Sequence, residues 1–196
     1  MIRALPILVV CWLLLAAPAQ AVTPLDYTRT TLEQARTIVA SSQANSEKLA
    51  ALSVLFGKFL DTDEMGREAL GQHWSSLTPA QQTEFLALFH ELLERTYVQK
   101  LLLFENPDFV YVGEQRSGAD AVVDTKIVTS RDQFDIRYQL RPDGGAWMAT
   151  TITVEDVSLT ANLGSQLNDM LSRMSVDDVL SVMRRKYGVA SVAVES

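Results

Sequence analysis

The chain contains few side chains whose types and spacing could support catalysis. It has two histidines, His73 and His90, in 196 residues. His73 falls in a predicted loop and His90 on the polar half of a predicted helix, so we expect a solvated or structural role for each. The sequence has no His-Glu-x-x-His motif, no glycine-rich phosphate loop and no Gly-x-Ser-x-Gly motif. The usual signatures of metal, nucleotide and serine-hydrolase chemistry are therefore missing.

Two acidic groups could be considered as metal ligands. Asp61, Asp63 and Glu64 lie close together, but the segment lacks the loop glycine and the terminal glutamate of an EF-hand. An aspartate followed three residues later by a glutamate is instead typical of a helix start. Asp177 and Asp178 also begin a predicted helix, where the helix dipole favours acids. We predict no metal site and no cofactor.

A third acidic pair, Glu155 and Asp156, follows the last predicted strand. Paired carboxylates can perform acid–base chemistry when they are buried. One alternative hypothesis is therefore an enzyme with a helix-and-sheet cone fold, in which Tyr138 or Tyr97 works with Asp124 or Glu155. This hypothesis requires a tyrosine and a carboxylate that face the same small pocket.

The first 21 residues are typical of a secretory signal peptide. Arg3 precedes an apolar run over residues 4–17, and an Ala-Gln-Ala sequence ends at Ala21. The run is too short to span a membrane. The single cysteine, Cys11, lies inside it and is expected to be one more apolar residue of the run. We predict cleavage near Ala21 and export across the inner membrane.

Length and composition indicate one domain over residues 22–190, followed by a short tail over 191–196. The formal net charge of −7 disfavours nucleic acid and anionic membrane surfaces as electrostatic partners. Apolar residues make up 47% of the chain. Such a composition fits a large core or an apolar cavity, and composition alone does not separate the two.

The first half of the mature chain has the spacing of helices. Thr78, Pro79 and Gln81 form the clearest start signal, with a capping threonine, a proline at the first helical position and a capping box. The predicted helices cover residues 24–41, 46–60, 61–70, 79–104, 159–174 and 176–187.

Between residues 109 and 154 the apolar period changes to two, which predicts strands. The segment over residues 133–140 alternates clearly, with Phe134, Ile136 and Tyr138 on one face. The predicted strands cover residues 109–112, 121–129, 133–140 and 146–154. Short polar connections imply hairpins. We predict an α+β fold, with helices packed on one face of a four-stranded antiparallel meander sheet.

The order of several short motifs resembles the MlaC or toluene-tolerance family over roughly residues 25–186. In the helical half these motifs are Phe59-Leu60-Asp61, Met65-Gly66-Arg67, Ala69-Leu70-Gly71, Trp74, Thr78-Pro79, Gln81-Gln82, Phe85, Phe89, Leu92-Leu93 and Thr96-Tyr97. In the second half they are Trp147, the run from Val154 to Leu159, Asn162, Ser165 and Gln166. The chain departs from the family pattern at two places. Leu163-Gly164 replaces a Tyr-Arg pair, and Asp156 replaces a glycine.

The resemblance implies a periplasmic lipid carrier and not an enzyme. Members of this family are similar in fold, with helices wrapped on a four-stranded sheet and an apolar pocket between them that takes acyl tails. They move phospholipid between an inner-membrane ABC complex and an outer-membrane lipoprotein complex, touching these complexes transiently. Alternative hypotheses are a carrier of hopanoid or sterol-type lipids and a ligand-free adaptor between the two complexes.

Burying an acyl chain stabilises a complex by roughly 0.8 kcal/mol per CH₂ group, so the pocket requires apolar walls more than reactive groups. The candidate lipid-binding residues lie on the long helix, on the third and fourth strands and on the helix that follows them. They are Phe89, Leu93, Tyr97, Ile136, Tyr138, Ile152, Val154, Leu159, Leu163 and Leu167.

Overall fold

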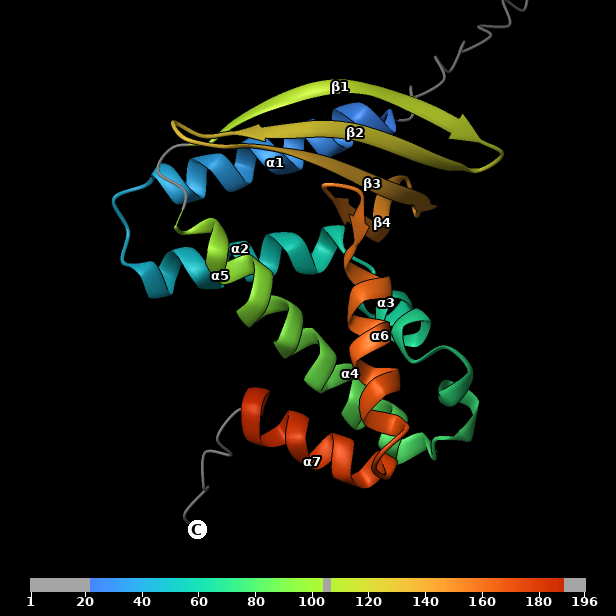
Figure 1. Ribbon diagram of the computed structural model, residues 1–196. Coiled ribbons are helices and arrows are strands. Elements are labelled where there is room, and N and C mark those ends of the chain that lie inside the picture. Colours follow the sequence, from blue (N-terminus) through green and yellow to red (C-terminus); the bar gives the residue numbers. More distant parts are fainter. Residues whose placement is uncertain (1–21, 104–106, 189–196) are drawn as a thin grey trace, which may run out of the picture.

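The computed structural model describes residues 22–103 and 107–188. The predicted signal peptide, the C-terminal tail and the expected end of the long helix at Phe104 lie outside these residues. The described part of the chain has the predicted α+β fold, with helices and an antiparallel meander sheet (Figure 1).

The sheet has the strand order β1-β2-β3-β4-β5, and all neighbouring strands are antiparallel. Its strands are β1 (Asp108–Ser117), β2 (Asp120–Val128), β3 (Gln133–Asp143), β4 (Ala146–Val154) and β5 (Val157–Ser158). The prediction of four strands is therefore wrong by one for the described residues. Alternation over two residues is too short to be recognised in a sequence, which is why β5 was missed.

Glu155 and Asp156 form the two-residue turn between β4 and β5. Both have positive φ, 49° and 63°. A two-residue hairpin turn of type I′ requires positive φ at both of its central residues. The Glu155 amide donates to the carbonyl of Asp135, and the Asp135 amide donates to the Glu155 carboxylate. This acidic pair is thus part of the sheet architecture, and Asp156 occupies a position that suits glycine.

Side-chain caps mark the start of several helices. Thr23 accepts a hydrogen bond from the amide of Asp26, and Thr78 and Ser175 each form a capping box. The helices are α1 (Pro24–Ala40), α2 (Asn45–Phe59), α3 (Thr62–Leu70), α4 (Pro79–Leu93), α5 (Gln99–Leu101), α6 (Leu159–Leu171) and α7 (Val176–Tyr187). A 3₁₀ segment, η1 (Gly71–Ser76), joins α3 to α4.

The long helix predicted over residues 79–104 is interrupted. After α4, residues Glu94–Val98 form a π-helical segment, η2, and the chain then continues into α5. The buried side chains of Leu93 and Val98 stand five residues apart, a spacing that a π turn matches and an α turn does not. The extra residue keeps the apolar side of the helix facing inwards as the helix approaches the sheet.

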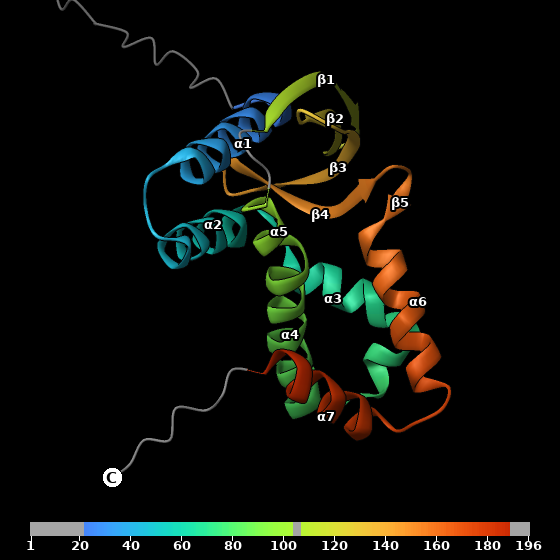
Figure 2. The ribbon, with the colours of Figure 1, turned by 60° about the vertical axis from the view of Figure 1, so that its left-hand side comes forward.

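Besides a small cluster around Leu52, two large apolar clusters divide the interior of the described part of the chain. One lies between the sheet and helices α1 and α2 and includes Phe59, Val123 and Tyr138. The other includes Phe85 and Phe89 and joins α3, α4, α6 and α7. Figures 1 and 2 show this second group extending away from the sheet, with α7 at its far end. The expected packing of helices on one sheet face thus holds for α1 and α2, whereas the other long helices pack mainly on one another.

Gly164 allows α6 to approach α3 closely. A Cβ atom at this position would lie 2.9 Å from the carbonyl oxygen of Ala69, a backbone atom that cannot turn aside. The Leu163-Gly164 departure from the family pattern therefore has a packing reason, because Leu163 is buried and Gly164 forms the contact.

Replacing Gly164 with alanine tests this contact. We expect Gly164→Ala to lower the free energy of unfolding by about 1–2 kcal/mol, because the clash outweighs the gain in helix propensity. Gly57→Ala in α2 is the matched control, since nothing lies within 4 Å of its added Cβ. The control should raise the free energy of unfolding by about 1 kcal/mol in urea titrations. Equal stabilisation by both variants would contradict the close approach.

The left-handed backbone at Asp156, in the turn between β4 and β5, gives a second prediction about stability. We expect Asp156→Gly to raise the free energy of unfolding by up to about 1 kcal/mol, because glycine removes the cost of a left-handed conformation. Asp143→Gly is the control, because Asp143 lies at the end of β3 and lacks a positive φ. Thermal or urea denaturation of both variants provides the comparison. A loss of stability in Asp156→Gly would show that the strain is absent.

Candidate functional site

A cavity of about 410 Å³ lies between the inner face of the sheet and the helices. Side chains that alternate along the strands form the sheet side of the cavity, namely Phe109, Ile127, Phe134, Ile136, Tyr138, Ile152 and Val154. Helices and their ends form the other side, through Leu32, Ala35, Phe56, Leu60, Tyr97, Val98, Lys100, Leu101 and Leu159. The walls are thus almost entirely aliphatic or aromatic.

The strand register explains how the sheet side forms. Phe109 of β1, Ile127 of β2 and Phe134 of β3 stand opposite one another across three strands. Ile136 and Tyr138 follow Phe134 at every second position, so they lie on the same face. One apolar face therefore continues over the strands and becomes the wall of the cavity.

The structure brings six of the predicted lipid-binding residues together at this cavity, which are Tyr97, Ile136, Tyr138, Ile152, Val154 and Leu159. The other four, Phe89, Leu93, Leu163 and Leu167, do not line it and lie in the helical cluster below the sheet. Along α4 and α6, the apolar side faces neighbouring helices until each helix reaches the sheet. The apolar spacing in the sequence could not show where along each helix this change occurs.

Sequence reasoning also missed several lining residues. Phe134 alternates with Ile136 and could have been found from the strand pattern. The helical lining residues Leu32, Ala35 and Phe56 could not have been found in this way. Their spacing in the sequence indicates only a buried side of a helix, and whether that side reaches the cavity depends on how the helix crosses the sheet.

The cavity offers little reactive chemistry. Tyr138 is 5% exposed and packs edge-on against Phe59, with ring centroids 5.6 Å apart. Burial raises the pKa of the Tyr138 phenol above its usual value. Burial also raises the pKa of Tyr97, and the nearby Tyr187 adds to this effect. Both phenols are therefore neutral near pH 7.

The tyrosine–carboxylate pair of the enzyme hypothesis is not assembled. Asp124 stands opposite Arg137 and accepts a hydrogen bond from it at 2.7 Å, whereas Tyr138 stands opposite Val123. Adjacent strand residues face opposite sides of the sheet, so Asp124 lies on the outer face and Tyr138 on the inner face. Glu155 lies at the β4–β5 turn and is exposed.

The acidic cluster near α3 has the capping role that its spacing predicts. Asp61 accepts a hydrogen bond from the amide of Glu64 at 2.9 Å and pairs with Arg141. Arg67 lies 3.7 Å from Asp63 and 3.0 Å from Glu64. Across residues 22–103 and 107–188, no group of three or more His, Cys, Asp or Glu side chains could hold a metal ion.

The two histidines lie at separate places in the helical part. His73 is in the 3₁₀ segment η1, and His90 of α4 lies 3.8 Å from Glu94. Neither residue is among those that line the cavity.

The fold and the cavity define a protein with an apolar cavity between a sheet and helices. A family model described as MlaC protein matches residues 27–185, and the chain belongs to the MlaC family. The resemblance drawn from the sequence motifs is thereby confirmed. Within the described residues, no helix has both the length and the apolar character needed to cross a membrane.

A solved structure with a similar fold is the phospholipid-binding protein from Ralstonia solanacearum, determined in complex with a phospholipid. The two chains share 20% sequence identity and superpose with a TM-score of 0.75. The match covers 85% of this chain and 97% of the other. At this identity the comparison shows a common fold.

The buried phenol of Tyr138 gives a prediction about pH. Its pKa is raised in the folded state from an unfolded value of about 10, so it does not alter stability below pH 10. Above pH 10 the unfolded chain ionises this phenol while the folded chain keeps it neutral, and stability falls. In Tyr138→Phe we expect this decline to be less steep, by an amount that grows above pH 10 towards a limit of about 1.4 kcal/mol per pH unit. Urea titrations between pH 8 and pH 11 measure it, and parallel curves for the variant and the wild type would contradict the burial argument.

Proposed function

We propose that this protein is a periplasmic phospholipid carrier that holds acyl chains in the cavity beneath the sheet. The observation that carries this proposal is the apolar lining of the cavity over both the sheet side and the helix side. A volume of about 410 Å³ falls in the range of roughly 300–1,000 Å³ typical of ligand pockets. Membership of the MlaC family and the phospholipid bound to the structural neighbour support the same ligand class.

The physical basis is the cost of exposing acyl chains to water. Each CH₂ group that leaves water for an apolar wall contributes roughly 0.8 kcal/mol, so a chain of many CH₂ groups is held without specific polar contacts. We propose that Ile136, Tyr138 and Ile152 form the sheet side of this contact. We propose that Leu32, Ala35 and the other lining side chains form the remainder.

The proposed route follows from the family and from the signal-peptide pattern. The protein is exported to the periplasm, takes lipid from one membrane complex and delivers it to another. We propose an inner-membrane ABC complex and an outer-membrane lipoprotein complex as these partners, with transient contact to each.

Native mass spectrometry tests the cargo. The protein should be purified from its own periplasm without detergent and measured before and after solvent extraction. We expect one stoichiometric adduct with the mass of a glycerophospholipid. An adduct with the mass of a hopanoid or a sterol would show that the cargo is not a phospholipid. A bare polypeptide mass that persists after incubation with phospholipid vesicles would overturn the proposal in favour of a ligand-free adaptor.

A cavity-filling variant locates the cargo. Ala35 is 3% exposed and lines the cavity, so Ala35→Phe fills part of the volume and should reduce lipid loading severalfold. Ala40→Phe is the matched control on the same helix, because Ala40 is exposed and lies outside the cavity. Melting temperatures of both variants establish that they are folded. Equal loading of Ala35→Phe and Ala40→Phe would place the lipid elsewhere.

A further inference from the structure

One lining residue differs in character from all the others. Among the described residues that line the cavity, Lys100 is the one that carries a charge and the one that is exposed. An exposed side chain that also lines a cavity marks its rim. Other lining side chains, such as Ile136 and Tyr138, are buried. The cavity therefore runs from a buried apolar end to a rim with one positive charge.

The ammonium group of Lys100 has no acidic partner in the described part of the chain. Its Nζ atom lies 5.9 Å from the centre of the Tyr97 ring, a weak contact that leaves its hydrogen-bond donors available. Most other basic side chains near the sheet are paired with acids, as Arg137 is with Asp124 and Lys126 with Asp135. The chain as a whole has a net charge of −7, so an unpaired basic side chain at the rim of the cavity stands out from its acidic surroundings.

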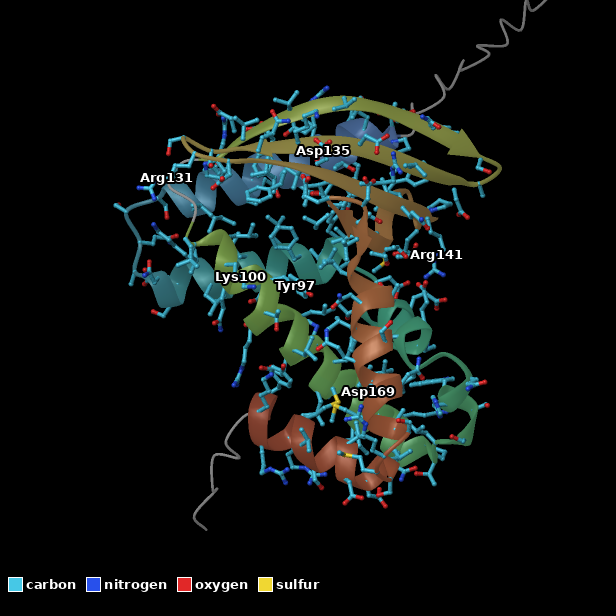
Figure 3. The ribbon with its side chains drawn as sticks, viewed as in Figure 1. Tyr97, Lys100, Arg131, Asp135, Arg141 and Asp169 are labelled. Carbon is cyan, nitrogen blue, oxygen red and sulfur yellow. The ribbon has the colours of Figure 1, made fainter. Side chains whose placement is uncertain are left out.

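The helix geometry fixes the position of Lys100. The π segment η2 ends at Val98, which is 7% exposed and anchors the chain to the cavity wall. Lys100 and Leu101 then fall on the single turn of α5, beside the cavity. Figure 3 shows Tyr97 and Lys100 beneath the sheet on this part of the helix. The aliphatic stem of a lysine can lie along apolar surface while its charged end stays in water.

We propose that Lys100 binds the phosphate group of the cargo lipid, so that the carrier favours lipids with an anionic phosphate headgroup. This inference rests on the proposed function, because it requires acyl chains in the cavity. A lipid whose tails fill the buried end carries its phosphate close to the rim, within reach of a flexible four-carbon side chain. An ammonium and a phosphate oxygen form a charge-assisted hydrogen bond, whereas a neutral headgroup gives no such partner.

Competition between two lipids with identical acyl chains tests the proposal. Vesicles should contain phosphatidylglycerol and diacylglycerol in equal amounts, and the lipids bound to the full mature chain are quantified by mass spectrometry. We expect Lys100→Met to lower the ratio of bound phosphatidylglycerol to bound diacylglycerol by about two- to fivefold, a modest effect because the charge pair is exposed. Lys100→Arg should retain most of the ratio.

Lys186→Met is the matched control. Lys186 of α7 is also exposed and lies over a tyrosine ring, with its Nζ 5.1 Å from the centre of Tyr187, but it does not line the cavity. The control removes the same charge and should leave the ratio unchanged. An equal fall in both variants would show that only net charge matters and would overturn the assignment to Lys100.

The remaining outcomes separate this inference from the proposed function. Unchanged ratios in Lys100→Met, with both lipids still bound, would overturn the phosphate contact and leave the carrier function standing. A wild-type protein that binds neither lipid would overturn both.

Discussion

The cavity depends on the attachment of α2 to the sheet at the C-terminal end of the helix. Phe59, which is 1% exposed, fills the space between α2 and the sheet and contacts the ring of Tyr138. Immediately after it, the Asp61 amide donates to the carbonyl of Ala149 at 2.9 Å, and the Asp61 carboxylate pairs with Arg141. These contacts fix one end of the helix against the sheet. Figure 1 shows the other end of α2 lying farther from it.

This arrangement leaves an apolar sheet face that protein side chains cover only in part. Such a space lowers stability when it is empty, because its walls lose contacts that a packed core would make. A ligand that fills it stabilises the folded state in proportion to its affinity and concentration. The separate helical cluster around Phe85 and Phe89 supports the fold without the ligand. The molecule thus divides its interior between a packed part that maintains the structure and an open cavity, which is the place of the cargo in the proposed function.

The sequence predicts the elements better than their arrangement. The capping box at Thr78 and the alternation of Ile136 with Tyr138 are local patterns, and both appear in the structure as expected. Phe89 and Leu163 show the limit of such patterns. The spacing of apolar residues on a helix predicts that they are buried, but it does not predict whether a sheet, a helix or a ligand covers them. The π segment likewise depends on how the end of a helix meets the sheet, which a single sequence does not contain.

The most direct test of a cavity that holds acyl chains is a crystal structure of the protein loaded with a phospholipid brominated near the ends of its acyl chains. The anomalous signal of bromine locates the chain ends without reference to the surrounding density. The account predicts these peaks beside Ile136 and Tyr138, between the sheet and helices α1 and α2. Peaks within the helical cluster around Phe85, or on the outer sheet face near Arg137, would contradict it.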